Sequence, residues 1–197
     1  MNLTVVTATR VEAQAARKAL SPGVRVVECG ISLARQCEFD GIAMSCGLAG
    51  GLRDDFPTGT VIVPARVRRP DGTMLECDAE LTASLTTAAR DLGYRVANDP
   101  LITSAGLVHG AERAAWAPEY AAVDMETGLI RAERIACVRV ILDTPQREIS
   151  PAWLTPLRAA FTPSAWRDLP FLAREGPRCS AIAAAVIAAA ENKKRRS

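Results

Sequence analysis

The feature that most constrains the fold is the alternation of short apolar runs with longer amphipathic stretches over about the first 145 residues. Leu3–Thr7, Ile42–Cys46 and Ala136–Leu142 are short apolar runs typical of buried strands. Arg10–Leu20 has the spacing of a helix with one apolar face and is followed by Ser21-Pro22-Gly23, a stop signal. This alternation predicts an α/β fold of βαβ units, in which helices lie on both faces of a central β-sheet.

The same patterns predict the remaining elements. Strands are expected at Val24–Glu28, Thr60–Val67 and Leu101–Val108, and helices at Thr82–Leu92, from near Glu126, and at Cys179–Glu191. The segment Pro145–Pro177 carries several prolines and no clear period, so we expect it to be irregular or broken helix. Without a repeat or a long polar linker, residues 1–197 are predicted to form a single domain, in which 145–197 is a divergent C-terminal region ending in a helix.

Charge and cysteine content narrow the classes of partner. The 24 basic and 22 acidic residues give a net charge of +2, which is too balanced to indicate a nucleic-acid partner. His109 is the sole histidine, and the six cysteines include no C-x-x-C pair, so we expect no metal site. The first residues resemble a strand and not a signal peptide, so we expect reduced thiols and a cytoplasmic location.

Four polar or glycine-rich segments follow predicted strands. In an open α/β sheet, ligands bind outside the carboxyl ends of the strands, so these segments are candidates for a binding site. They are Thr7–Glu12, Cys46–Leu52, Val123–Gly128 and Val138–Pro145.

Two of these segments offer carboxylates for acid–base chemistry. Glu12 lies in the first turn of the predicted helix, where the helix dipole stabilises its charge; a solvent-facing partner of that dipole is the alternative. Asp143 ends an apolar strand, so burial would raise its pKa and suit it to act as a general acid. The alternative for Asp143 is an ordinary turn before Pro145.

The other two segments are suited to contact a sugar. Gly47, Gly50 and Gly51 form a predicted turn that a ligand can approach closely, although neither a phosphate loop nor a dinucleotide fingerprint is present. Glu126 can accept hydrogen bonds from the vicinal hydroxyls of a ribose, with the Met125 thioether beside the sugar. The alternative is that Asp124 caps a helix and Met125 is part of the core.

Taken together, the order, spacing and strand-end positions of these segments resemble the purine nucleoside phosphorylase and methylthioadenosine phosphorylase/nucleosidase family. The similarity covers about Met1 to Pro145, with gaps. Gly47–Leu52 resembles the family's G-x-A-G-G-L motif, Val123–Glu126 its V-[DE]-M-E segment, and Val138–Asp143 its V-R-x-I-S-D strand. Ser104–Val108 stands where family members carry S-x-D-x-F, the wall of the base pocket.

The resemblance implies an α/β fold of three layers, with a mixed central β-sheet flanked by helices. It also implies cleavage of the N-glycosidic bond of a purine, adenine-type nucleoside. Asp143 would protonate or hydrogen-bond the purine N7, Glu126 would bind the ribose hydroxyls above Met125, and Glu12 would activate water. The other residues expected to line the substrate site are Val123, Gly47, Ala49, Gly50, Leu107 and Val108.

Departures from the family pattern leave alternatives open. Leu142 replaces the serine before the catalytic aspartate, and Leu107 or Val108 replaces the aromatic that stacks on the base, so a catalytically degenerate nucleoside-binding protein of the same fold is the alternative function. No cofactor is expected, with phosphate as a possible co-substrate that Arg10 and Arg53 would bind. Because Glu12 would repel a phosphate dianion, we expect hydrolysis to be favoured over phosphorolysis.

The C-terminal region resembles the hopanoid-associated branch of the family, since the chain is short and Arg147–Leu172 is rich in proline and tryptophan. That branch is thought to remove adenine from an adenosyl-hopane lipid. An apolar helix with Ile182, Val186 and Ile187, followed by a basic tail, would suit an anionic membrane surface, although a core-packing helix is the preferred interpretation. The resemblance also implies a homo-oligomer, most simply a dimer.

Overall fold

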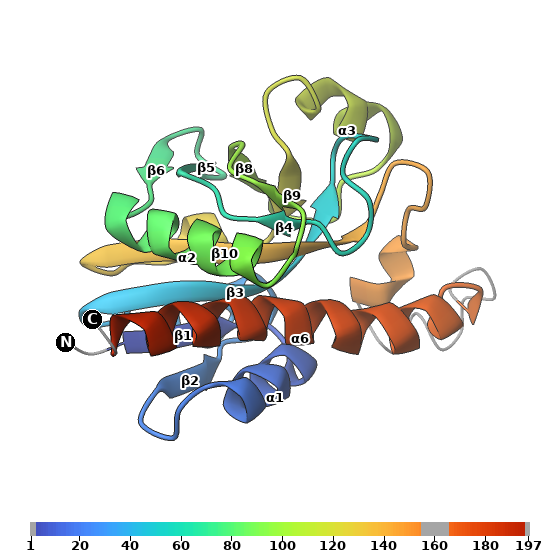
Figure 1. The fold of residues 1–197 in the computed structure, drawn as a ribbon. Helices are drawn as coiled ribbons and strands as arrows, with labels where there is room; N and C mark the ends of the chain where they lie inside the picture. The colour runs from blue at the N-terminus through green and yellow to red at the C-terminus, as the bar shows by residue number, and fades with distance from the viewer. Residues whose placement is uncertain (1–2, 155–165, 196–197) are drawn as a thin grey trace.

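The computed structural model describes residues 3–154 and 166–195, and one ten-stranded mixed sheet runs through them (Figure 1). The strand order is β6-β5-β8-β9-β3-β10-β4-β7, and β1 pairs with both β3 and β2. The strands are β1 (Leu3–Thr7), β2 (Arg25–Glu28), β3 (Ile42–Gly51), β4 (Val61–Ile62), β5 (Arg66–Arg68), β6 (Met74–Glu76), β7 (Val96–Ala97), β8 (Leu101–Thr103), β9 (Ala122–Asp124) and β10 (Arg134–Asp143). The mixed sheet expected from the sequence is confirmed.

The two longest strands, β3 and β10, form the parallel centre of the sheet. Arg139 lies beside Gly47, and Asp143 lies beside Gly50 after a register shift that follows Ile141. β9 pairs antiparallel with the end of β3, which brings Val123 beside Gly50. The carboxyl halves of β3 and β10, together with β9 beside them, therefore bring together residues from three of the four candidate segments.

Helices cover the sheet as the alternation predicts. The helices are α1 (Arg10–Ala19), α2 (Ala79–Asp91), α3 (Gly110–Trp116) and α6 (Leu169–Lys194), together with 3-10 turns at Ile31–Leu33, Thr127–Leu129 and Pro151–Leu154. α6 lies across β3 and β10, with α1 and α2 on its two sides (Figure 1). The other face of the central strands packs against side chains of β5 and β8, because the sheet curls over itself there, and α3 lies beyond them.

The glycine-rich segment predicted as a turn is in fact the last part of β3, so that prediction is wrong. Gly47 to Gly51 stay in the sheet because β10 pairs with them on one side and β9 on the other. Glycine is needed here because there is no space for a side chain. An added Cβ at Gly47 or Gly51 would meet side chains of β10.

Two predicted strands are shorter than the apolar pattern suggested. Thr60–Val67 divides into β4 and β5, which are separated at Pro64, a residue that has no N–H to donate to a sheet ladder. The strand predicted at Leu101–Val108 ends at Thr103, after which the chain leaves the sheet and forms the wall of a cavity. β6, β7 and α3 were not predicted, because their sequences are short and lack a distinct period.

The helix predicted from Glu126 is only the 3-10 turn Thr127–Leu129. Gly128 donates a hydrogen bond to the Thr103 hydroxyl (2.8 Å), and Ile130 is already extended, so the chain turns back toward β10 after one turn.

At the other end of the chain, α6 extends the predicted helix in both directions and includes Pro177, within a segment predicted to be irregular. The exposed Pro177 costs the helix a hydrogen bond, and buried residues on either side, such as Cys179, hold the helix together. The part of the predicted irregular segment at 155–165 lies outside the described residues.

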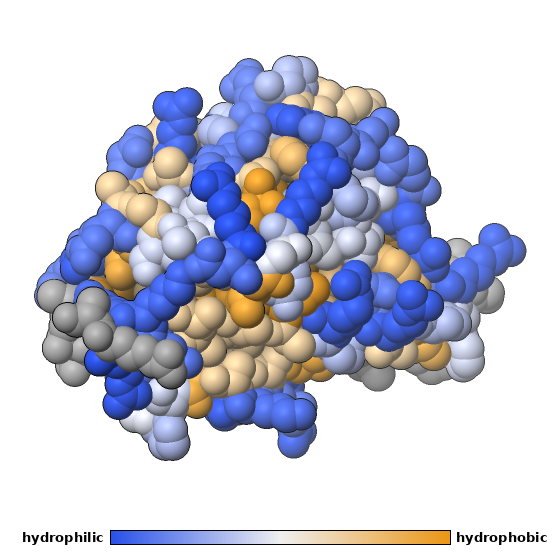
Figure 2. All heavy atoms as spheres, in the orientation of Figure 1, coloured by the Kyte–Doolittle hydropathy of each residue, from blue (hydrophilic) through white to orange (hydrophobic). Residues whose placement is uncertain are grey.

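The apolar residues of α6 belong to the core. Ile182, Val186 and Ile187 are buried against the sheet, so they are not available to a membrane surface. Figure 2 shows hydrophobic side chains over the middle of α6, surrounded by hydrophilic ones on the same face. In the described residues, no helix combines the length and apolar character needed to cross a bilayer.

Candidate active site

Glu12 reaches from α1 to β3. Its Oε2 accepts hydrogen bonds from the backbone N–H of Thr9 (2.8 Å) and Ala8 (3.1 Å) and from the Thr9 hydroxyl (2.9 Å), while Oε1 accepts one from Leu48 N (3.0 Å). The Thr9 hydroxyl in turn accepts a hydrogen bond from the backbone N–H of Glu12. The two residues thus form a capping box, which is a local reason for α1 to begin here. The carboxylate is 4% exposed, so the solvent-facing alternative is wrong.

A buried guanidinium binds Asp124, at the end of β9, and Glu126, two residues later, and lies near Glu12. Arg139 is 1% exposed, and its Nη2 lies 2.8 Å from Asp124 Oδ2 and 3.4 Å from Glu126 Oε2. An added Cβ at Gly47 would come within 3.0 Å of both Glu12 Oε1 and Arg139 Nη1. Gly47 therefore lets these two side chains approach each other, and we call Glu12, Asp124, Glu126 and Arg139 the Arg139 cluster.

Hydroxyls complete the Arg139 cluster. The guanidinium also donates to the Ser45 hydroxyl (2.8 Å) and to the Thr127 hydroxyl (3.0 Å). Asp124 accepts hydrogen bonds from Thr103 Oγ1 (2.6 Å) and from Thr127 N (3.0 Å), the first N–H of the 3-10 turn. The N-cap position of that turn is held by Glu126, so the helix cap predicted as the alternative is met only in part. Its burial and its ion pair with Arg139 also make Asp124 the main counter-charge of the cluster.

The cluster shifts the proton affinity of Glu126. Burial raises the pKa of Glu126 to about 7, with Arg139 opposing the shift and the charges of Asp124 and Glu12 adding to it. Burial alone would lower the pKa of Arg139, but the charges of Asp124 and Glu126 outweigh it and raise that pKa. Glu126 therefore titrates near neutral pH beside a guanidinium that stays charged.

Asp143 lies in a second polar group with Arg113 of α3. Arg113 Nη2 is 2.5 Å from Asp143 Oδ2, and the two side chains are 4% and 10% exposed. Asp143 Oδ1 lies over Gly50, where an added Cβ would approach it to 3.1 Å. Burial raises the pKa of Asp143, while the charge and hydrogen bond of Arg113 and the nearby His109 act to lower it. The ordinary-turn alternative does not describe this buried aspartate.

The two groups follow one another along the same pair of strands. Gly47 is beside the Arg139 cluster and Gly50 beside Asp143, so about 10 Å of strand separates the two groups at about 3.3 Å per residue. The structure thus brings Glu12, Glu126 and Asp143, far apart in sequence, to the carboxyl halves of two neighbouring strands, and none of them faces bulk solvent.

The residues expected near the base enclose a cavity of about 300 Å³ at the end of β8. Leu107 is partly exposed at this cavity, whereas Val108 is buried against Leu52, Ile102 and Val123. Other residues that line the cavity include Arg68, Thr103, Ser104, Glu112 and Trp116.

The remaining expected site residues have mixed placements. Ala49 and Val123 are buried in the sheet and Met125 is half-buried beside Glu126. Arg10 is exposed at the start of α1. Arg53 is held by Asp55 (2.9 Å) and Asp99 (2.8 Å), so its charge is already matched, which disfavours the role of phosphate ligand expected for it.

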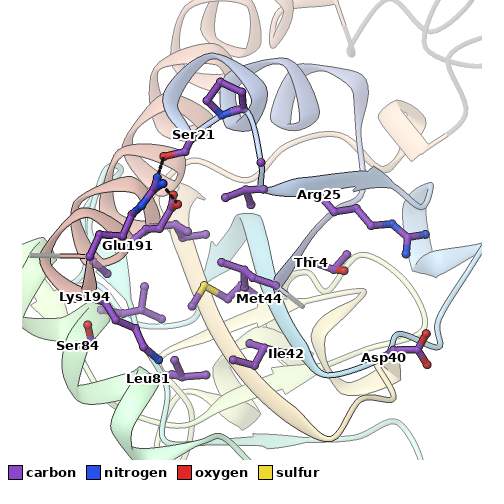
Figure 3. Close-up of a pocket in the computed structure, with 18 residues that line it drawn as sticks. Thr4, Ser21, Arg25, Asp40, Ile42, Met44, Leu81, Ser84, Glu191 and Lys194 are labelled. Atoms are coloured by element: carbon purple, nitrogen blue, oxygen red, sulfur yellow. Dashed lines mark hydrogen bonds and ion pairs between the residues drawn. The ribbon is translucent and has the colours of Figure 1, made fainter. Parts of the chain in front are cut away.

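A larger cavity of about 630 Å³ lies at the opposite end of the strands (Figure 3). Ile42, Met44 and Leu81 form its apolar interior, and Arg25 and Asp40 stand at its rim. Because Ile42 begins β3, this cavity is at the amino ends of the parallel strands, away from the carboxylates. The three candidate acids line neither cavity.

Within residues 3–154 and 166–195, no group of three or more histidine, cysteine, aspartate or glutamate side chains is arranged to hold a metal ion.

Sequence reasoning gave no role to Arg139, considered Asp124 only as a helix cap, and gave no role to Arg113. The first two lie within motifs quoted above, and the signal that could have identified them is charge balance: a buried strand that carries an arginine needs a buried acid nearby. Arg113 lies on a helix that was not predicted, so no sequence pattern placed it near Asp143.

Comparisons with known proteins agree with this geometry at the level of fold. No protein-family model matches the chain, and no curated protein sequence does. Among solved structures, the MTAN nucleosidase of Helicobacter pylori, a mutant with 5′-methylthioadenosine in the active site, is 13% identical with a TM-score of 0.72, and the match covers 98% of each chain.

Two further structures are similar over their full lengths. The 5′-methylthioadenosine/S-adenosylhomocysteine nucleosidase of Neisseria meningitidis, in complex with methylthio-immucillin-A, is 17% identical with a TM-score of 0.70, covering 97% of this chain and 98% of that one. Futalosine hydrolase of Helicobacter pylori is 12% identical with a TM-score of 0.70, covering 97% of each. The chain therefore has the fold of the nucleoside phosphorylase and methylthioadenosine nucleosidase family that its sequence resembles.

Proposed function

We propose that this protein hydrolyses the N-glycosidic bond of an adenine-type purine nucleoside. The observation that carries the proposal is the placement of three buried carboxyl groups beside β3 and β10. Glu12 and Glu126 lie at the Arg139 cluster, and Asp143 lies nearer the carboxyl ends of the strands. The interval of about 10 Å between the groups suits a nucleoside that lies along the strands, its sugar at the cluster and its base at Asp143. The fold shared with known nucleosidases supports the same reaction class.

In the proposed reaction, Asp143 gives its proton to N7 of the purine while the C1′–N9 bond breaks and its electron pair stays with the base. Glu126 holds the ribose hydroxyls during this step. A water molecule then bonds to C1′ through its oxygen and loses a proton to Glu12. Burial raises the pKa of Asp143 and so favours the protonated form that a general acid requires.

Water suits this site better than phosphate. Glu12 and Glu126 place negative charge where the nucleophile would arrive, and Arg53 is already paired with two aspartates. A phosphate dianion would meet this repulsion while Arg53 is already paired, whereas a neutral water molecule would not be repelled.

The test is to incubate the purified protein with adenosine and with 5′-methylthioadenosine, with and without phosphate, and to identify the base and sugar products by chromatography. We expect free adenine and an unphosphorylated sugar at a rate independent of phosphate. Asp143→Asn should lower that rate by about 100-fold or more. Asp91→Asn is the matched control. Asp91 is an exposed aspartate paired with Lys193 and lies outside the candidate site, so this substitution should leave the rate unchanged. Strict phosphate dependence would contradict the role given to Glu12.

One observation favours a second candidate, a protein that binds nucleosides without cleaving them. The ion pair with Arg113 stabilises the charged form of Asp143, which cannot donate a proton. Calorimetry with adenine distinguishes the two candidates: tight binding without turnover of any nucleoside tested, in both the wild type and Asp143→Asn, supports the binding protein.

The group attached at the ribose C5′ is a finer point of the proposal. The apolar face of α6 is buried in the core, so it gives no support to a lipid-linked substrate. A series of adenosines with methylthio and longer apolar C5′ groups, compared by kcat/KM, measures how large a substituent the enzyme accepts.

A further inference from the structure

The hydrogen bond that orients Asp143 comes from an unexpected element. The residue before Asp143 is Leu142, which has no polar side chain, so the local sequence cannot supply a side-chain donor. The donor is Arg113, thirty residues earlier on α3, whose Nη2 lies 2.5 Å from Asp143 Oδ2. Such a bond between two ionised groups is stronger than a bond between neutral groups.

Arg113 is itself fixed from several directions. Nη1 donates to the carbonyl of Gly51 at the end of β3 (3.0 Å), and Nε and Nη2 donate to the carbonyl of Val108 (3.4 and 3.3 Å). Nε also lies 3.5 Å from Glu148 Oε1. A planar guanidinium with this many partners holds one orientation, so it ties the wall of the 300 Å³ cavity and the end of β3 to Asp143.

We propose that Arg113 is the positioning residue of Asp143: it holds Oδ2 so that Oδ1, over Gly50, is presented to the leaving purine. The proposal rests on the nucleosidase function proposed above. Arg113 replaces a donor that Leu142 lacks, so the Leu142 departure does not by itself indicate an inactive protein.

The charged groups that face Asp143, among the described residues, determine how loss of Arg113 would change the pH dependence of the reaction. Arg113 of α3 and His109, the residue before α3, face Asp143. Glu148, beyond the end of β10, accepts a hydrogen bond from Gly110 N (2.8 Å) and lies 3.6 Å from His109 Nδ1. Burial raises the pKa of Asp143 and Arg113 lowers it. Loss of the guanidinium should therefore raise that pKa further and extend the protonated form to higher pH.

The experiment measures kcat and KM for adenosine or 5′-methylthioadenosine hydrolysis across pH in the wild type, Arg113→Met and Arg113→Lys. For Arg113→Met we expect kcat to fall about 10- to 100-fold with KM within about threefold of the wild type, and the alkaline limb of kcat/KM to move to higher pH. Arg113→Lys keeps the charge but not the planar fork, so its kcat should fall while its alkaline limb stays near that of the wild type.

Arg134→Met is the matched control, because Arg134 makes the same kind of ion pair with Asp78 at the other end of β10. Its rate and pH limb should match the wild type. If Arg113→Met does not fold, Arg113→Lys decides the proposal by its kcat. Wild-type kcat with an unmoved limb in the Arg113 variants overturns the positioning role alone, whereas absence of cleavage by the wild type overturns the proposed function and this role with it.

Discussion

Substituting alanine for Gly47 isolates the contact on which the Arg139 cluster depends. The new methyl group would lie within 3.0 Å of both Glu12 Oε1 and Arg139 Nη1, closer than real Cβ atoms approach other heavy atoms. Both neighbours are ends of side chains, but neither is free to move, because each is buried and makes several hydrogen bonds. Gly47→Ala must therefore break bonds within the cluster or shift β3 against β10.

The expected cost has two parts. Loss of the hydrogen bond from Leu48 N to Glu12 leaves polar groups unsatisfied at about 1–3 kcal/mol. Overpacking by one methyl group adds about 1–3 kcal/mol. Against this, alanine reduces the entropy of the unfolded chain and returns about 0.4–1 kcal/mol. The net prediction is a loss of about 1–6 kcal/mol in the free energy of unfolding.

Urea unfolding followed by circular dichroism measures this loss, and thermal unfolding should show a melting temperature lower by about 2 °C or more. Gly23→Ala is the control, because an added Cβ there has no heavy atom within 4 Å, and its stability should stay within about 0.5 kcal/mol of the wild type. A Gly47→Ala variant as stable as Gly23→Ala would refute the close packing of Glu12 and Arg139 across this glycine.

Two further changes test the same cluster. Burial raises the pKa of Glu126 from 4.5 to about 7, so the folded protein keeps a proton there that the unfolded chain releases, and this group makes stability fall as pH rises through that window. Glu126→Gln should remove that slope, measured as the difference in unfolding free energy between about pH 5 and about pH 8; an unchanged slope would contradict the raised pKa. Arg139→Met should cost about 3–5 kcal/mol, because it leaves Asp124 and Glu126 buried without a cation. Adding Asp124→Asn to Arg139→Met should recover part of that loss in urea unfolding, and no recovery would count against the ion pair.

The secondary structure could be predicted from sequence where the local pattern was strong. β1 was predicted with its observed bounds, and α1 differed by one residue, because Thr9 and Glu12 signal a helix start through contacts only three residues apart. Predictions from local patterns were wrong where pairing with neighbouring strands determined the secondary structure. The glycines after Cys46 were predicted as a turn, yet pairing with β10 and β9 keeps them in a strand.

The candidate site shows the same division. Glu12, Glu126 and Asp143 could be named from sequence because each follows a strand in a motif of recognisable composition. Arg113 could not be named, because α3 is seven residues long and its link to Asp143 exists only through the folded sheet.

The sequence by itself determined the alternation of strands and helices, the central sheet that this alternation implies and the strand-end acids, since these follow from periodicity and from side-chain chemistry near each residue. Only the tertiary structure decided the partners of those acids: Arg139 for Glu126 and Arg113 for Asp143. The physical reason is that a buried charge takes its counter-charge from whichever strand or helix packs against it, and that packing depends on contacts between residues far apart in the chain.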